Sequence, residues 1–197
     1  MKTNFVQQNG YGLDDYCKNA EKLIQGKIKN SKSKVHFVSG GTQANLIVIS
    51  AFLRPHESVV SAATGHIFTN ETGAIEATGH KVHALETADG KIRPADILKV
   101  IDVHQNIPHQ VKQKLVYISN STEVGTIYSK KELQDLHHFC QEKNLFLFMD
   151  GARLGHALTS ETNDLTLEDV AKYTDAFYFG GTKNGALIGE AIVINNE

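Results

Sequence analysis

Lys183 is the residue of this chain with the clearest potential for chemistry. It follows the aromatic run 177–179 and lies in the glycine-rich stretch 180–185, and the apolar residues 186–188 come next. Burying an ammonium group among apolar strands and glycines is costly, so burial would lower the lysine pKa. A neutral amine can attack a carbonyl, as a Schiff-base lysine does. The alternative is a solvated lysine in a turn. The Walker phosphate-loop pattern is absent.

Two further stretches place a reactive group beside glycine or at the end of an apolar run. Gly41 and Thr42 open a predicted helix, where free amides and the helix dipole favour an anion, although an ordinary helix cap would look the same. Asp150 ends the apolar run 145–149 and needs a partner there. A protonated heteroaromatic nitrogen or the nearby Arg153 would serve, and an aspartate that caps a helix is the alternative.

His66 follows another apolar run and precedes Glu71. Its imidazole could stack on a flat ligand or move protons, or it could be a loop histidine with its hydrogen bonds satisfied. The remaining histidines, including His137 and His138, are expected at the surface, and their spacing predicts no metal site.

Apolar strand-like runs alternate with helical apolar patterns along most of the chain, which predicts an α/β fold with a mostly parallel sheet and helices on both faces. Strands are predicted at 35–38, 58–63, 81–85, 114–119, 145–149, 175–179 and 190–195, and helices at 14–25, 44–53, 69–78, 94–103, 130–143 and 167–172. Ligands bind at the carboxyl ends of parallel strands, so the turns that carry the reactive groups should meet there.

The bulk composition excludes several classes of protein. The chain has 197 residues and a formal net charge of −2, which gives no reason to expect a nucleic-acid or membrane partner. Its apolar runs are too short to span a bilayer. Cys17 and Cys140 are far apart in the sequence, and we expect free thiols in a reducing cytoplasm.

Together, the reactive groups match one cofactor. Pyridoxal 5′-phosphate has a phosphate for the helix start, a ring nitrogen for the carboxylate, a flat face for the imidazole and an aldehyde for the lysine. As an electron sink, it stabilises a carbanion at the α-carbon of an amino acid.

The chain resembles the threonine aldolase/β-eliminating lyase family of fold-type-I pyridoxal-phosphate enzymes. The resemblance is carried, in order, by residues 41–46, by Gly65-His66-Ile67 with Glu71, and by residues 149–153. Residues 122–125 and 181–185 look most like the phenylserine aldolase and low-specificity threonine aldolase branch. The resemblance implies the three-layer large domain of the aspartate-aminotransferase-like fold, with a last antiparallel strand, in a homodimer or homotetramer.

The resemblance also implies how the cofactor is held. Lys183 would form the internal aldimine. Gly41 and Thr42 would bind the phosphate, with Thr182 as a helper. His66 would stack on the pyridine ring.

Further roles implied by the resemblance concern the ring nitrogen and the substrate. Asp150 would pair with the nitrogen, and Arg153 would contact the phenolic oxygen or the substrate carboxylate. The expected reaction cleaves a β-hydroxy-α-amino acid, such as threonine or phenylserine, to glycine and an aldehyde. Many relatives place a histidine, a candidate base, where this chain has Thr122. This leaves His66, Glu71 or a bound water as the base.

Relatives in this family are longer. We therefore expect residues 1–197 to form one cofactor-binding large domain, incomplete at its N-terminus and without the C-terminal small domain. Two alternatives stay open. The chain could belong to another fold-type-I enzyme, a β-eliminating lyase or an aminotransferase, or it could be a truncated relic that folds without activity.

Overall fold

A single mixed β-sheet organises the molecule. The computed structural model describes residues 6–195. Within them, seven strands pair in the order β1-β7-β6-β5-β4-β2-β3. Their bounds are β1 Lys34–Val38, β2 Glu57–Ala62, β3 Val82–Leu85, β4 Lys112–Ser119, β5 Phe146–Asp150, β6 Ala176–Gly180 and β7 Glu190–Ile194. Strands β2 to β6 run parallel, whereas β7 is antiparallel to both β6 and β1. The predicted mostly parallel sheet with an antiparallel last strand is confirmed.

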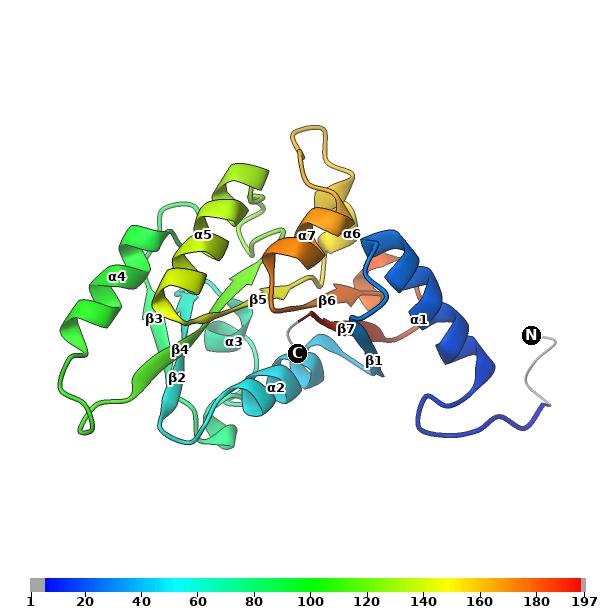
Figure 1. Cartoon of the computed structure of the whole chain (residues 1–197), viewed down its shortest axis with the longest axis horizontal. Helices are drawn as coiled ribbons and strands as arrows, with labels where there is room; N and C mark the ends of the chain where they lie inside the picture. Colours follow the sequence, from blue (N-terminus) through cyan, green and yellow to red (C-terminus); the bar gives the residue numbers. More distant parts are fainter. Residues whose placement is uncertain (1–5, 196–197) are drawn as a thin grey trace.

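Helices cover both faces of the sheet, so the predicted three layers are present (Figure 1). One face carries α1, α4, α5, α6 and α7, and the other carries α2 and α3. The bounds are α1 Asp15–Ile28, α2 Gly41–Phe52, α3 His66–Thr69, α4 Pro94–Val103, α5 Lys130–Lys143, α6 Leu154–Leu158 and α7 Leu167–Tyr173.

The central strands are buried on both faces. Successive side chains of a strand point to opposite faces. Val60 and Leu147 therefore pack under the α4–α7 layer, while their neighbours Val59 and Phe148 pack under α2 and α3. Every residue of β2 is buried. Such strands form a rigid platform, and their carboxyl ends carry the turns of interest.

The predicted helix at 69–78 is wrong. Within this segment only Thr69 is α-helical, as the last residue of α3, and an irregular stretch then leads to a single 3₁₀ turn at Glu76–Thr78. Thr72 and Gly73 both adopt positive φ, at 55° and 76°, which a right-handed helix does not allow. The buried residues Glu71 and Ile75 on either side tie this irregular stretch to the sheet.

The expectation that the other histidines lie at the surface is also wrong for His80 and His83, which are buried. His80 Nδ1 lies 3.1 Å from the Glu57 carbonyl oxygen, and His83 Nε2 lies 3.1 Å from Ser58 Oγ. Both histidines belong to the edge of the sheet near β3, where backbone and hydroxyl groups satisfy their ring nitrogens.

Two further predictions concern membrane-spanning segments and the cysteines. No helix between residues 6 and 195 has the length and apolar character needed to cross a bilayer. Cys17 on α1 and Cys140 on α5 are free thiols.

Candidate cofactor site

A pocket of about 280 Å³ lies at the carboxyl ends of the strands and collects all the predicted site residues. Its lining includes Gly41, Thr42, His66, Asp150, Arg153, Thr182 and Lys183. These residues come from the turns after β1, β2, β5 and β6. Parallel strands with buried centres bring such turns together, as the order of the sequence elements predicted.

Asp150 is the most tightly held group of the pocket. It is buried, and its carboxylate accepts four hydrogen bonds. Oδ1 accepts from Tyr178 Oη at 2.5 Å and from Ala152 N at 2.9 Å. Oδ2 accepts from Tyr117 Oη at 2.6 Å and from Asn45 Nδ2 at 3.2 Å. Hydrogen bonds donated to a carboxylate favour its charged form.

The two tyrosines act as donors because they keep their protons. Burial raises the pKa of Tyr117 and of Tyr178, and the nearby Asp150 charge raises both further. Sequence reasoning missed both residues. The signal was available, since a carboxylate at the end of a buried strand needs donors and the neighbouring strands are the nearest source.

Arg153 is not a partner of Asp150 among the described residues, so the predicted alternative pairing of these two side chains is not formed. Arg153 is instead exposed at the rim of the pocket. There its guanidinium group is available to a ligand carboxylate or phenolate.

His66 begins α3 and is held from behind by Glu71. His66 Nδ1 lies 2.9 Å from Glu71 Oε1, which also accepts from Asn45 Nδ2 at 2.6 Å. The hydrogen bond to Glu71 raises the pKa of His66, against the effect of burial. The Glu71 side chain is fully buried and is not part of the pocket lining. Asn45 therefore links the carboxylate behind His66 to Asp150.

The start of α2 presents backbone amides to the pocket. Gly40 is the helix cap and supplies no side-chain acceptor, and the first intrahelical bond runs from Ala44 N to the Gly40 carbonyl oxygen. The N–H groups of residues 41–43 thus have no intrahelical partner, which suits an anion. A Cβ at Gly41 would lie 2.8 Å from Tyr178 Oη. Glycine at this position leaves the hydroxyl room to reach Asp150.

Lys183 lines the pocket, and of the two alternatives for its side chain the structure shows the solvated lysine in a turn rather than the buried one. It lies in the 3₁₀ turn Thr182–Asn184 and is exposed. Residues 186–188 form a loop rather than a strand, and Leu187 is 95% exposed. The apolar residues 186–188 do not indicate burial, because a short apolar run that pairs with no strand need not be buried. Thr182 Oγ1 accepts from Gly189 N at 3.0 Å and holds the loop together.

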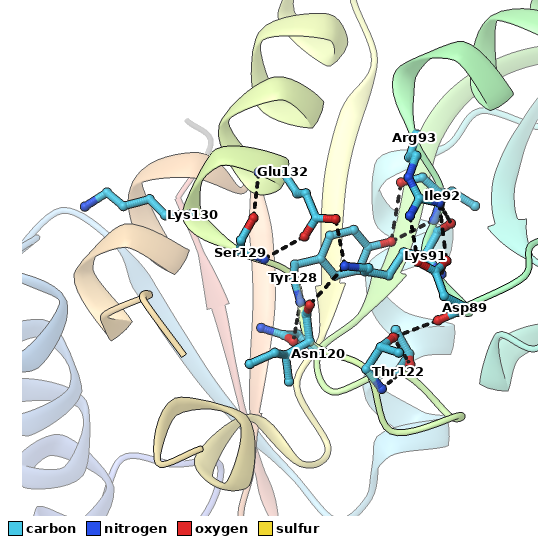
Figure 2. A network of polar contacts seen from close by, with 12 residues as sticks. Asp89, Lys91, Ile92, Arg93, Asn120, Thr122, Tyr128, Ser129, Lys130 and Glu132 are labelled. Atoms are coloured by element: carbon cyan, nitrogen blue, oxygen red, sulfur yellow. Dashed lines mark hydrogen bonds and ion pairs between the residues drawn. The ribbon is translucent and has the colours of Figure 1, made fainter. Parts of the chain in front are cut away.

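The turn after β4 places Glu123, and not Thr122, in the lining of the pocket. Thr122 is buried, and its Oγ1 bonds to Thr126 Oγ1 at 2.7 Å. Figure 2 shows Thr122 within the polar network that includes Asp89 and Tyr128. The next residue, Glu123, lines the pocket, and sequence reasoning missed it. Which of two adjacent turn residues faces a site is not encoded in any periodic pattern.

The sheet and the pocket at its carboxyl end define an α/β domain of the fold-type-I class. Residues 5–197 match the beta-eliminating lyase family, and the chain belongs to it. The chain is 35% identical over 201 residues to a low specificity L-threonine aldolase from Pseudomonas sp. (strain NCIMB 10558), and 34% identical to one from Pseudomonas aeruginosa.

Similarity extends to a solved structure. The chain superposes on a threonine aldolase from Leishmania major with a TM-score of 0.98, at 52% identity and over 99% of its own length. It covers 57% of the length of that protein and of both Pseudomonas enzymes, and all of its own length matches each of those two. The similarity therefore extends over only part of each relative.

Proposed function

We propose that this chain is the pyridoxal-phosphate-binding part of an aldolase that cleaves β-hydroxy-α-amino acids to glycine and an aldehyde. The observation that carries the proposal is one pocket that joins a carboxylate with four donors, an amide-rich helix start and Lys183. Members of the family are known pyridoxal-phosphate enzymes, and the relatives above are named threonine aldolases.

The residues present fit that cofactor. Asp150, whose carboxylate is oriented by hydrogen bonds from Tyr117 and Tyr178, would pair with the protonated ring nitrogen. The free amides at Gly41 and Thr42 would bind the phosphate, with Thr182 beside them. Lys183 would hold the aldehyde carbon through its amine. When bound, the cofactor supplies an electron sink for the α-carbon of the substrate.

His66 and Arg153 complete the proposed assignments. The His66 ring, oriented by Glu71, would lie against the flat face of the cofactor. Arg153, exposed at the rim, would bind the substrate carboxylate or the phenolic oxygen through a planar fork of donors.

The remaining parts of the proposal concern the whole protein. Residues 1–197 would form its large domain, working in the cytoplasm as a homodimer or homotetramer. Exposed apolar side chains support an assembly, because clusters of them mark contact surfaces. On or near α1 these are Tyr11, Leu13, Tyr16 and Leu23, and Leu187 and Ile188 lie beside the pocket.

Product analysis tests the proposed activity. The purified chain is incubated with pyridoxal phosphate and with threonine or phenylserine, and acetaldehyde or benzaldehyde is measured. We expect release from the wild type and from the control Lys99→Ala, a variant at an exposed α4 position, but not from Lys183→Ala. Formation of a keto acid without aldehyde would favour the β-eliminating lyase or aminotransferase alternative. A bound cofactor without any product would favour an inactive relic.

A further inference from the structure

Three carboxylates line the pocket, namely Glu123, Asp150 and Glu190. They differ in how many hydrogen bonds their oxygens accept from the protein. Asp150 accepts four hydrogen bonds, shared between both oxygens. Glu190 is buried, and its Oε2 accepts from Gly181 N at 2.7 Å, which anchors the turn that carries Lys183. The carboxylates of Asp150 and Glu190 are therefore already engaged in hydrogen bonds within the protein.

Glu123 has a different arrangement. Its Oε1 accepts from Ser119 Oγ at 2.7 Å and from His66 N at 3.0 Å. Among the described residues these are the hydrogen bonds that its side chain accepts from other residues, and both end on the same oxygen. No other described residue donates to Oε2, and the Glu123 side chain lines the pocket. Glu71, the other acidic candidate, is sealed behind His66 and cannot reach a ligand directly.

The surroundings of Glu123 suit proton exchange. Burial raises the pKa of Glu123, and the charge of Asp150 adds to this effect, while hydrogen bonds from Ser119 and His66 oppose it. The titratable groups around it are Tyr117, Asp150 and His66, and the same pocket is lined by Glu190, Arg153 and Lys183. A carboxyl group shifted upward toward neutral pH can both accept and return a proton.

Hydrogen bonds brace the turn that presents Glu123, and Figure 2 shows those around Asn120, Tyr128 and Asp89. Thr126 Oγ1 donates to the Asp89 carbonyl oxygen at 2.7 Å, and Tyr128 N donates to Asn120 Oδ1 at 3.2 Å. Tyr128 Oη in turn accepts from Ile92 N at 2.9 Å. These bonds fix the path of the chain on both sides of Glu123, so its carboxyl group is oriented before a ligand arrives.

We propose that Glu123, and not a residue at the position of Thr122, is the proton acceptor for the substrate β-hydroxyl. This assignment rests on the proposed function. The hydroxyl proton moves to Glu123 Oε2, and the O–H electron pair forms the carbonyl of the departing aldehyde. The Cα–Cβ electron pair stays with the α-carbon. That carbon then takes up a proton, which gives glycine, and Glu123 returns to its carboxylate form when it gives up its own.

A titration without cofactor is the first test. The chain is labelled with glutamate carrying ¹³C at the side-chain carboxyl, and Glu123→Gln identifies the Glu123 signal. Glutamine keeps the Oε1 acceptor but has no carboxyl proton. We expect the Glu123 signal to titrate above the ordinary glutamate range, because burial raises its pKa. A Glu123 signal that titrates in the ordinary glutamate range would overturn the proposal.

Aldehyde release is the second test, with cofactor absorbance recorded alongside. We expect Glu123→Gln to keep the cofactor band and to lower kcat by about 100-fold or more, the range that general-base catalysis supplies. The acid limb of its pH profile should also be lost, while Glu76→Gln behaves as wild type. Release from Glu123→Gln within threefold of wild type would overturn this proposal alone. A wild type that releases no aldehyde would overturn the proposed function itself and this assignment with it.

Discussion

The hydrogen bonds that hold Asp150 can be tested by removing single hydroxyl groups. Tyr117→Phe and Tyr178→Phe each delete one donor to the carboxylate and leave the ring in place. A hydrogen bond to a charged group contributes about 1.5–3 kcal/mol, and both tyrosines are almost completely buried, so water cannot replace the lost donor. Each variant should therefore lose about 1.5–3 kcal/mol of unfolding free energy, and the double variant about 3–6 kcal/mol.

Equilibrium unfolding in urea measures these changes. Tyr16→Phe is the matched control because Tyr16 lies on α1 and is 55% exposed. A surface change of this kind should stay within about 0.5 kcal/mol of wild type. The double variant also reports coupling, since both hydroxyls serve one carboxylate. If Tyr117→Phe and Tyr178→Phe are as stable as Tyr16→Phe, the conclusion that these two hydroxyl groups hold the Asp150 carboxylate is refuted.

Two further predictions concern histidines. Glu71→Gln replaces the carboxylate whose hydrogen bond and charge raise the pKa of His66 with a neutral amide, so the NMR titration midpoint of His66 should fall, and an unchanged midpoint would contradict the role given to Glu71. Burial lowers the pKa of His83 from 6.5 to about 4. Its neutral form thus contributes stability above pH 6.5 that is lost as pH falls toward 4. Urea unfolding measured at pH 6.5 and near pH 4 should show a smaller loss of unfolding free energy for His83→Gln than for wild type. An equal loss in both proteins would show that His83 does not cause this pH dependence.

Much of the fold could be predicted because local signals agreed with the final packing. Helix α5 is predicted at both ends, Lys130–Lys143, because Ser129 and Glu132 form a capping box and Asn144 ends the helix in the left-handed conformation. The helix predicted at 69–78 failed because Thr72 and Gly73 turn the backbone. No apolar rhythm reveals that turn, and burial of the flanking side chains stabilises it.

The site residues that directly follow a strand could be predicted from the sequence. His66, Asp150 and Lys183 follow strands whose carboxyl ends meet in a parallel sheet, so order along the chain was enough to place them. Tyr117 and Glu123 were not predictable in this way. Their roles depend on which side of a strand or turn faces the pocket, and that is settled by sheet register and by the bracing of the turn.

The central claim is that Lys183 bonds to the aldehyde of pyridoxal phosphate, and reduction followed by peptide mapping tests it most directly. The chain is incubated with the cofactor, reduced with sodium borohydride and digested, and the modified peptide is sequenced by mass spectrometry. The account predicts a pyridoxyl group on Lys183 and its loss in Lys183→Ala. Modification spread over exposed lysines, or equal labelling of Lys183→Ala, would contradict it.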